Sequence, residues 1–353
     1  MKKFYTVLVA ALLCFGLNAC GKKEAGQETG KETGKETGKE TETSSASKKV
    51  GLVFDIGGRG DKSFNDAAYK GLEEAKQKLG IDFEVIDPGD GSDRESALRK
   101  LASKKDIGLV FGVGFIFTDD INNIAKEFPD KKFACVDYSI DPAKQIPANV
   151  EAIEFKEEEG SFLVGVIAAL NSKTNKVGFI GGMESNLIRK FEEGFKQGVQ
   201  YADPDCQVLS GYVSVSPEGF KNPGKAKEIA LSQYNSGADI IYHASGLSGL
   251  GLFEAAREKN KFAIGVDMDQ QKEAPGFVMT SMVKLVDRAV FNTVKDFTEN
   301  KFTGGIKTFG LQDNGVSYVY DDNNKSLISD EIILKTEEAK KKLSGGEIKI
   351  VLK

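Results

Sequence analysis

The segment spanning residues 50–79 reads VGLVFDIGGRGDKSFNDAAYKGLEEAKQKL and contains the unit that decides the fold. Its first six residues form a short apolar run typical of a buried strand, and residues 64–79 carry apolar side chains at helical spacing. A loop of small and charged residues separates the two. A strand followed by a loop and a helix begins a right-handed crossover between parallel strands, so this segment predicts a parallel sheet.

The same alternation of strand and helix continues through two successive units. Apolar runs typical of strands occur at residues 50–55, 83–87, 107–112, 133–137 and 150–155, and again at 177–181, 208–213, 240–243 and 262–266. Helical spacing occurs at residues 64–79, 92–102, 118–128, 157–170, 187–201, 226–234 and 252–259. This order predicts an α/β fold. Two similar open units in succession favour two doubly wound lobes with a cleft between them.

The first 19 residues have the pattern of a signal peptide. Two lysines precede an apolar run at residues 4–17, which is too short for a bilayer core of ~30 Å that needs ~20 apolar residues. The sequence Leu-Asn-Ala-Cys at 17–20 resembles the lipobox of bacterial lipoproteins, which implies cleavage before Cys20 and lipidation of its thiol. The alternative is an ordinary signal peptide followed by an incidental cysteine.

The segment that follows Cys20 is predicted to be a tether. Residues 26–41 read Gly-Gln-Glu-Thr followed by three copies of Gly-Lys-Glu-Thr, and residues 21–47 contain almost no apolar side chains. Such a segment cannot bury enough surface to offset its ordering entropy. We therefore expect a lipidated cysteine and a disordered tether at residues 20–47.

Composition argues against several classes of function. A net charge of −5 supplies no excess of cations for phosphate backbones, so no nucleic-acid partner is expected. The single histidine, His243, argues against His-rich metal sites and His-dependent triads, and we expect it to be structural. With Cys14 removed and Cys20 lipidated, Cys135 and Cys206 are the remaining thiols; they could pair, but we expect both to be buried and free.

Enzyme motifs fit the loops poorly. Residues 57–63 resemble a phosphate-binding loop, but Asp61 would repel the phosphates. Residues 112–114 lack the third glycine of a dinucleotide fingerprint, and residues 246–250 lack the last glycine of a nucleophile elbow. Asp267 and Asp269 could suggest a metal, but companion ligands are missing. We therefore predict no enzyme activity, no metal and no cofactor.

Four blocks of sequence resemble the basic membrane protein family of purine nucleoside receptor lipoproteins, the binding subunits of ABC importers. They are DIGGRGDKSFND at 55–66, GFIGGM at 178–183, GVDMDQ at 265–270 and TSMVK at 280–284. The resemblance implies a type I periplasmic binding protein fold with a three-segment hinge, crossing near residues 152–155, 275–281 and 303–311. It implies one lobe at 48–153 plus 280–303 and another at 154–279 plus 304–353.

The resemblance also implies where a purine base would bind. Phe64 and Phe191 occupy the positions of two rings that clamp the base, and stacking tolerates different bases. Asn65 and Asp137 would bond to the edge of the base, and Met183 would pack near it. Taken by themselves, the two rings could instead be helix-start and core residues, Asp137 a cap, and Met183 a core residue.

The same resemblance implies that the second lobe and the hinge hold the ribose. Asp267 would accept bonds from sugar hydroxyls, and Lys284 would donate to sugar oxygens while offsetting the charge of that acid. Gly246 would let the backbone approach the ribose, and Asp55 would support the wall of the first lobe. The alternative for Lys284 is a solvated cation at a helix start.

The predicted function is the capture of purine nucleosides such as inosine, guanosine or adenosine and their delivery to an ABC permease. Asp55, Asp137 and Asp267 would repel a phosphate group in the cleft, and Lys284 alone would attract it. Nucleoside monophosphates are therefore expected to be poor ligands. We expect a monomer on the extracytoplasmic face of the cell membrane, which it contacts through the lipid anchor only. A sugar-binding lipoprotein of the same fold and a surface adhesin are the alternatives.

Overall fold

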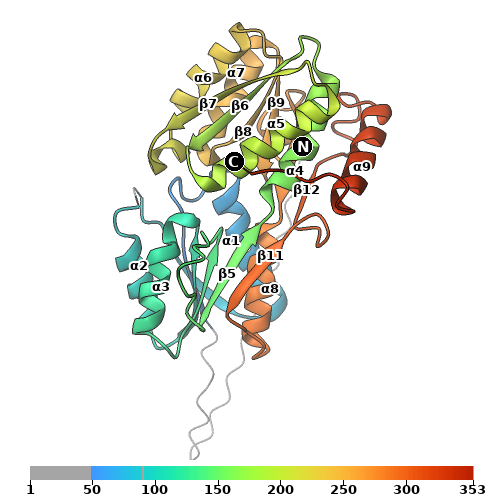
Figure 1. Ribbon diagram of the computed structural model, residues 1–353. Coiled ribbons are helices and arrows are strands. Elements are labelled where there is room, and N and C mark those ends of the chain that lie inside the picture. The colour runs from blue at the N-terminus through green and yellow to red at the C-terminus, as the bar shows by residue number, and fades with distance from the viewer. Residues whose placement is uncertain (1–48, 90, 353) are drawn as a thin grey trace, which may run out of the picture. The chain divides into compact units, whose positions relative to one another are not determined.

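The computed structural model describes residues 49–89 and 91–352, so the predicted signal peptide, Cys20 and the tether lie outside the described residues. The described residues form two six-stranded sheets, and each sheet has helices on both faces (Figure 1). Strands and helices alternate along the chain in both lobes, as the sequence predicts.

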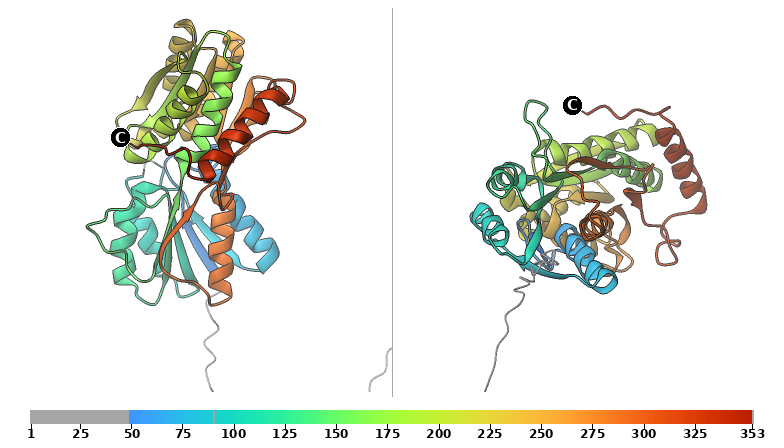
Figure 2. Two further views of the ribbon diagram at one scale, coloured as in Figure 1. Left: turned by 45° about the vertical axis from the view of Figure 1, so that its right-hand side comes forward. Right: turned by 90° about the horizontal axis from the view of Figure 1, so that it is seen from below.

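The first sheet has the strand order β11-β5-β4-β3-β1-β2, and its strand pairs are parallel. Its strands are β1 (Lys49–Val53), β2 (Asp82–Ile86), β3 (Ile107–Val113), β4 (Lys132–Val136), β5 (Val150–Phe155) and β11 (Gly305–Phe309). One face is covered by α1 (Phe64–Leu79) and α8 (Val286–Thr298), and the other by α2 (Arg94–Ala102) and α3 (Thr118–Glu127) (Figure 2).

The second sheet has the order β12-β10-β9-β8-β6-β7 and is parallel except for the pairing of β10 with β12. Its strands are β6 (Lys176–Met183), β7 (Gln207–Ser214), β8 (Ile240–Ala244), β9 (Phe262–Asp267), β10 (Val278–Lys284) and β12 (Val316–Tyr318). Its helices are α4 (Glu157–Asn171), α5 (Asn186–Ala202) and α9 (Asp330–Ser344) on one side, and α6 (Pro223–Asn235) and α7 (Gly249–Lys259) on the other.

Short 3-10 helices follow several strands. They are η1 (Phe115–Phe117), η2 (Pro217–Phe220), η3 (Gly246–Ser248) and η4 (Gln271–Glu273). Each lies between a strand and the next regular element, at or near the carboxyl end of the preceding strand. Because ligands of open α/β sheets bind beyond these ends, the short helices belong to the region where a site is expected.

Small residues set the distance between the two helices that pack together most extensively, α4 and α5. A Cβ atom at Gly194 would lie 2.3 Å from the carbonyl oxygen of Glu158, and one at Gly198 would lie 2.0 Å from that of Phe162. Glycine at these positions therefore allows the backbones of α4 and α5 to touch. This close contact fixes α5, which carries Phe191.

Three chain segments connect the lobes. The chain passes from β5 to α4 at Lys156, from β10 to α8 at Leu285, and from β11 to β12 through residues 310–315. Backbone hydrogen bonds tie them together, from Lys156 N–H to the Phe309 carbonyl and from Leu285 N–H to the Gly315 carbonyl, both at 2.9 Å. The three-segment hinge implied by the resemblance is therefore present.

The sheets correct the predicted lobe boundaries at 154, 280 and 304. Residues 154–155 end β5, and residues 305–309 form β11, so both belong to the first sheet. Residues 280–284 belong instead to the second sheet, because β10 continues to pair with β9 as far as Val283 opposite Asp267. The second crossing thus follows Lys284, and that lysine ends a strand of the second lobe.

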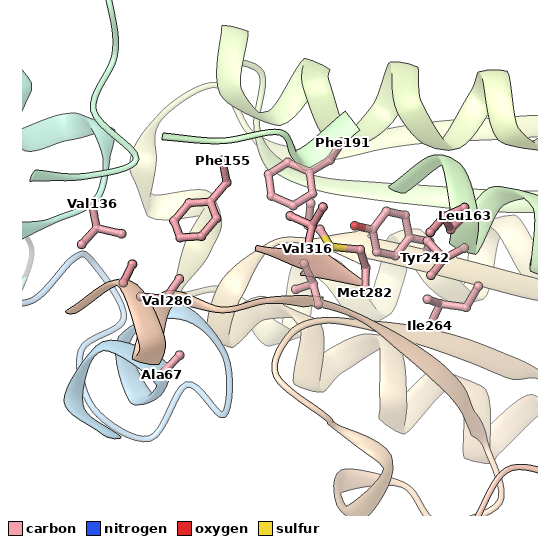
Figure 3. Packing of buried hydrophobic residues seen from close by; sticks show 14 of the residues in the cluster. Ala67, Val136, Phe155, Leu163, Phe191, Tyr242, Ile264, Met282, Val286 and Val316 are labelled. Atoms are coloured by element: carbon pink, nitrogen blue, oxygen red, sulfur yellow. The ribbon is translucent and has the colours of Figure 1, made fainter. Parts of the chain in front are cut away.

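A hydrophobic cluster runs through the hinge from one sheet to the other. Figure 3 shows its members lying in a row across the junction: Ala67, Val136, Val286, Phe155, Phe191, Val316, Met282, Tyr242, Ile264 and Leu163. Phe155 of the first sheet and Phe191 of α5 lie close to each other near the middle of this row. The hinge is therefore packed, and the lobes meet at a defined place.

Candidate functional site

A cavity lies between the two lobes at the carboxyl ends of their strands; we call it the interlobe cavity. Its volume is about 50 Å³, which is below the roughly 300–1,000 Å³ typical of small-molecule sites. The two lobes are thus close together, and the cavity between them is narrow.

Eight of the nine ligand-binding residues predicted from the sequence line the interlobe cavity. They are Asp55, Phe64, Asn65, Asp137, Phe191, Gly246, Asp267 and Lys284. Met183, the ninth, lines a neighbouring cavity instead. The ring of Phe220 packs against Gly182, where a Cβ atom would lie 2.4 Å from it, and Phe220 lines the interlobe cavity where Met183 does not.

Sequence reasoning missed a second aromatic pair. Phe115 from the first lobe and Phe220 from the second both line the interlobe cavity, with ring centroids 6.4 Å apart and planes at 72°. Phe115 lies two residues beyond the end of β3 and could have been found by the rule that sites lie beyond strand ends. Phe220 lies in η2, in a polar stretch between β7 and α6, and its sequence neighbours give no such signal.

The predicted aromatic clamp comes from both lobes. Phe64 begins α1, and Phe191 lies in the second turn of α5. The Lys284 ammonium lies 4.7 Å from the centroid of the Phe64 ring and 5.3 Å from that of Phe191, so the rings are no more than about 10 Å apart. Phe191 is 3% exposed and also belongs to the hydrophobic cluster, so it serves both packing and the cavity wall.

Lys284 is surrounded by three carboxylates. Its Nζ atom lies 2.6 Å from Asp137 Oδ2, 3.6 Å from Glu157 Oε1 and 3.8 Å from Asp267 Oδ1. The side chain of Lys284 is 1% exposed. Burial by itself would lower the pKa of this amine, but the nearby carboxylates outweigh burial and raise it. Lys284 is therefore a buried cation whose charge compensates several acids, and the alternative of a solvated lysine is contradicted.

Asp137 and Asp267 occupy equivalent places in the two lobes. Asp137 follows the last residue of β4, and Asp267 is the last residue of β9. Both have left-handed backbones, with φ of 60° and 64°. A residue other than glycine rarely adopts this conformation, which costs about 1–3 kcal/mol and persists chiefly where the surrounding structure requires it. The two acids are held facing Lys284 from opposite lobes.

The two acids differ in how their oxygens are used. Asp137 Oδ1 is buried and has no hydrogen-bond partner among the described residues. Asp267 Oδ2 accepts a 2.5 Å bond from Ser63 Oγ, which belongs to the first lobe. Asp137 therefore offers a free acceptor to a ligand, whereas Asp267 already joins the lobes. Gln270 Nε2 adds a second link by donating to the Lys62 carbonyl at 3.0 Å.

The glycine-rich loop after β1 is held together by its own side chains. Asn65 Oδ1 accepts a 2.8 Å bond from the Asp55 backbone N–H, and Asn65 Nδ2 donates to Asp61 Oδ2 at 3.1 Å. Asp61 also accepts bonds from the backbone N–H groups of Ser63 and Asn65. Asn65 is 2% exposed, so it positions the loop and leaves one amide hydrogen for a ligand.

Gly246 lines the interlobe cavity from the second lobe. It begins η3 with a φ of 54°, a conformation that glycine adopts without strain. A Cβ atom there would lie 3.4 Å from the carbonyl oxygen of Phe220. A side chain at this position would therefore be strained, and the smooth backbone wall that the sequence predicts depends on glycine.

Burial raises the pKa of Asp55 to about 7, with the charges of Asp137 and Asp61 adding to the effect and the Ile56 backbone N–H and the more distant Arg94 opposing it. Because this pKa is higher in the folded than in the unfolded chain, the folded state binds the proton more tightly. The stability of the protein should therefore increase as the pH falls from 8 to 6.5. Asp55 alone should contribute about 1 kcal/mol over this interval.

Urea unfolding of the protein and of Asp55→Asn at pH 8 and 6.5 tests this expectation. Between pH 8 and 6.5 the free energy of unfolding should increase less in Asp55→Asn than in the unsubstituted protein, because the asparagine amide does not titrate. Glu158, whose burial likewise raises its pKa to about 7, remains in both proteins and cancels in the comparison. The difference between the two proteins therefore reports Asp55 together with its coupling to Asp137 and Asp61. An equal gain in both proteins would show that Asp55 titrates normally.

His243 and the two described cysteines have structural roles. His243 is fully buried, its ring nitrogens lie 3.1 Å from Ser245 Oγ and 3.0 Å from Gln270 Oε1, and burial lowers its pKa to about 4. This confirms the prediction of a satisfied imidazole. Cys135 and Cys206 are both buried and free, as expected.

Comparison with known proteins identifies the family. The family model described as "ABC transporter substrate-binding protein PnrA-like" matches residues 48–351. The chain belongs to this family. This PnrA-like protein therefore has a substrate-binding role in ABC transport, and the resemblance carried by the four sequence blocks is confirmed.

Relatives and a solved structure agree with this assignment. The "CD4+ T-cell-stimulating antigen" of Listeria innocua is 33% identical to the PnrA-like protein over 372 residues, with 99% of this chain and 98% of that one covered. "Basic membrane protein A" of Borreliella burgdorferi is 36% identical over 308 residues, covering 85% and 86%. An ABC transporter solute-binding protein from Aeropyrum pernix K1 matches with a TM-score of 0.77 and 28% identity, covering 86% and 93%. The predicted type I periplasmic binding protein fold is confirmed.

Proposed function

We propose that this PnrA-like protein binds unphosphorylated purine nucleosides in the interlobe cavity and delivers them to an ABC permease. The observation that carries the proposal is the position of the Lys284 ammonium. It lies near two aromatic rings from opposite lobes. It also lies beside Asp137 and Asp267, whose backbones adopt the left-handed conformation. Flat rings suit a base, and paired acid and amine groups suit the hydroxyls of a ribose.

The base would lie between Phe64 and Phe191. Stacking on an aromatic ring contributes ~1–3 kcal/mol per base and does not depend on which purine is present. The unpartnered Asp137 Oδ1 would accept a hydrogen bond from an N–H group at the edge of the base. Asn65, whose side chain mainly holds the loop, would contribute its remaining amide hydrogen.

The ribose would lie toward the second lobe. Asp267 would accept bonds from the sugar hydroxyls through Oδ1, because Oδ2 is taken by Ser63. Lys284 would donate to a sugar oxygen, and the backbone at Gly246 would close the wall behind the ring. Hydrogen bonds to charged groups of this kind contribute ~1.5–3 kcal/mol each.

Capture would be coupled to closure of the hinge. A ligand that contacts residues of both lobes favours the closed arrangement by its differential affinity. Ser63 and Gln270 reach across the cleft and would stabilise the same arrangement without contacting the base. A permease would then recognise the closed form.

The protein would act at the outer side of a membrane. The Leu-Asn-Ala-Cys sequence at 17–20 supports lipidation of Cys20 and a tethered domain on the extracytoplasmic face. Within residues 49–89 and 91–352, none of the helices has the length and apolar character needed to cross a bilayer. Lipidation of Cys20 would hold the domain near its permease.

Calorimetric titration with inosine, guanosine, adenosine and their 5′-monophosphates tests the proposed ligand class. We expect the nucleosides to bind and the monophosphates to bind at least about a hundredfold more weakly, equivalent to ~2.7 kcal/mol. The reason is that Asp55, Asp137 and Asp267 line a narrow cavity in which Lys284 is the lining cation.

Two further results of the same titration would count against the proposal. Tighter binding of the monophosphates would exclude a site built for an uncharged ligand. If nucleosides do not bind and free ribose does, the result would favour a sugar-binding protein of the same fold. Mass spectrometry of a small molecule that copurifies with the domain is an independent check, since it requires no choice of ligand.

A further inference from the structure

A second cavity adjoins the interlobe cavity and shares Phe115, Asp137 and Leu187 with it; we call it the adjoining cavity. It lies between the loop after β4, the end of β5, the loop after β6 and the first turns of α5. Its volume is about 590 Å³. It is thus much wider than the interlobe cavity.

The walls of the adjoining cavity carry more acids than free cations. Asp137, Glu154, Glu184 and Glu193 line it. Its two cations are already paired, since Arg189 donates to Glu184 and Lys190 lies 2.8 Å from Glu157. Glu193 contacts a cation, Lys196, only at 4.0 Å. Four acids and two cations line the cavity, a formal excess of two negative charges. Asp137 is itself paired with Lys284, so Glu154 and Glu193 carry this excess.

One buried atom marks the boundary between the two cavities. Asp137 is 5% exposed, it lines both cavities, and its Oδ1 atom has no hydrogen-bond partner among the described residues. A buried carboxylate oxygen without a partner is costly, so the position is suited to a donor supplied by a ligand. In the proposed binding mode this oxygen meets the edge of the purine base.

We propose that the adjoining cavity is a subsite for a substituent on the edge of the base, and that it favours an amine or another cationic hydrogen-bond donor. This inference rests on the proposed function. A group attached to the edge that faces Asp137 would leave the narrow interlobe cavity and enter the wide one. There it would meet Glu154 and Glu193, which attract a cation and repel an anion.

Titration with a matched series of substituted adenosines tests the subsite. The series is adenosine and its derivatives with a six-carbon chain on N6 or on C2, ending in an amine, a methyl group or a carboxylate. One of the two attachment positions, N6 or C2, lies on the edge of the base that faces Asp137. For the derivatives substituted at that position, we expect the amine to bind within about threefold of adenosine and at least about tenfold more tightly than the carboxylate. The methyl derivative should lie between them.

A variant that removes one acid from the adjoining cavity tests whether this cavity causes the preference for amine over carboxylate derivatives. Glu193→Gln should reduce the preference for amine over carboxylate by about threefold and leave the affinity for adenosine unchanged, because Glu193 does not line the interlobe cavity. Glu228→Gln, which removes an exposed acid of α6, should change neither quantity. An unchanged preference in Glu193→Gln would overturn the subsite.

The outcomes separate this inference from the function on which it rests. If adenosine binds and every substituted derivative fails, the subsite is wrong and the proposed function stands. If amine and carboxylate derivatives bind equally, the adjoining cavity is an opening to solvent without charge selectivity, and the inference is overturned. If no purine nucleoside binds at all, both proposals fail together.

Discussion

Replacing Asp267 with alanine is expected to abolish detectable nucleoside binding. In the proposed site Asp267 accepts hydrogen bonds from the ribose hydroxyls, and it also accepts the 2.5 Å bond from Ser63 that joins the lobes. Loss of hydrogen bonds to a charged group, at ~1.5–3 kcal/mol each, should weaken binding by about a hundredfold or more. Calorimetric titration with inosine or guanosine measures the effect.

The same variant should leave the fold intact. Burial raises the pKa of Asp267, with Lys284 and the Ser63 hydroxyl opposing, so removing this carboxyl removes a buried charge that is costly to desolvate. Lys284 keeps Asp137 and Glu157 as partners, so the substitution leaves no unpaired buried cation. We expect the melting temperature of the ligand-free protein to change by no more than a few degrees. Asp269→Ala is the matched control, because Asp269 lies two residues away and is exposed. Retained affinity in Asp267→Ala would show that another acid holds the ligand.

Replacing Lys284 with methionine should have the largest effect on stability. The ammonium lies within 3.8 Å of Asp137, Glu157 and Asp267, and its removal leaves three buried carboxyl groups without their common cation. Breaking a buried ion pair by removing one partner costs about 3–5 kcal/mol. We expect a loss of this size in the free energy of unfolding at pH 8, measured in urea, together with loss of nucleoside binding.

The effect of Lys284→Met should depend on pH with a definite sign. The pKa of Lys284 is raised, so the amine is charged at any pH below its usual value near 10.4. The pKa of Asp137 is already raised to about 7 by burial, and without the lysine it should rise further. As the pH falls from 8 to 6, protonation of Asp137 should therefore remove its uncompensated buried charge in the variant. The loss in the free energy of unfolding caused by Lys284→Met should be smaller at pH 6 than at pH 8.

A double variant keeps this prediction testable if the single variant does not accumulate. Asp137→Asn combined with Lys284→Met removes one acid along with the cation and should be more stable than Lys284→Met alone. Lys70→Met is the control for loss of a surface ion pair, because Lys70 is 58% exposed in its contact with Asp287 and should cost at most about 1 kcal/mol. Equal effects of Lys70→Met and Lys284→Met would contradict the buried-cation interpretation.

Much of the fold could be predicted because local patterns specify it. The predicted helix at residues 64–79 coincides with α1, and the strand at 150–155 coincides with β5. Apolar runs separated by helical spacing leave few alternatives to a parallel sheet. The hinge was placed less well: the crossing expected near 275–281 follows Lys284, because β10 continues to pair with β9 and β12. Strand pairing is a long-range property, and local sequence did not reveal where it stops.

The candidate site divides in the same way. Acids and glycines after strands, such as Asp137 and Gly246, are visible in the sequence because the carboxyl ends of parallel strands meet at one edge. Met183 follows the same rule but lines the adjoining cavity, and the ring of Phe220 lies against Gly182, the residue before it. The role of Phe220 depends on how η2 packs, and its neighbours in the sequence do not report it.

The sequence by itself determined the α/β class, the two repeated units, the family and the chemistry present at the strand ends. Tertiary structure decided which of these groups face one another: it placed Lys284 among three carboxylates from both lobes, left Asp137 Oδ1 without a partner, and joined a second cavity to the first. The physical reason is the separation along the sequence over which each effect acts. Periodicity and turn chemistry act between neighbouring residues. Burial, charge compensation and cavity shape also depend on groups far apart in the sequence, such as Lys284 and Asp137.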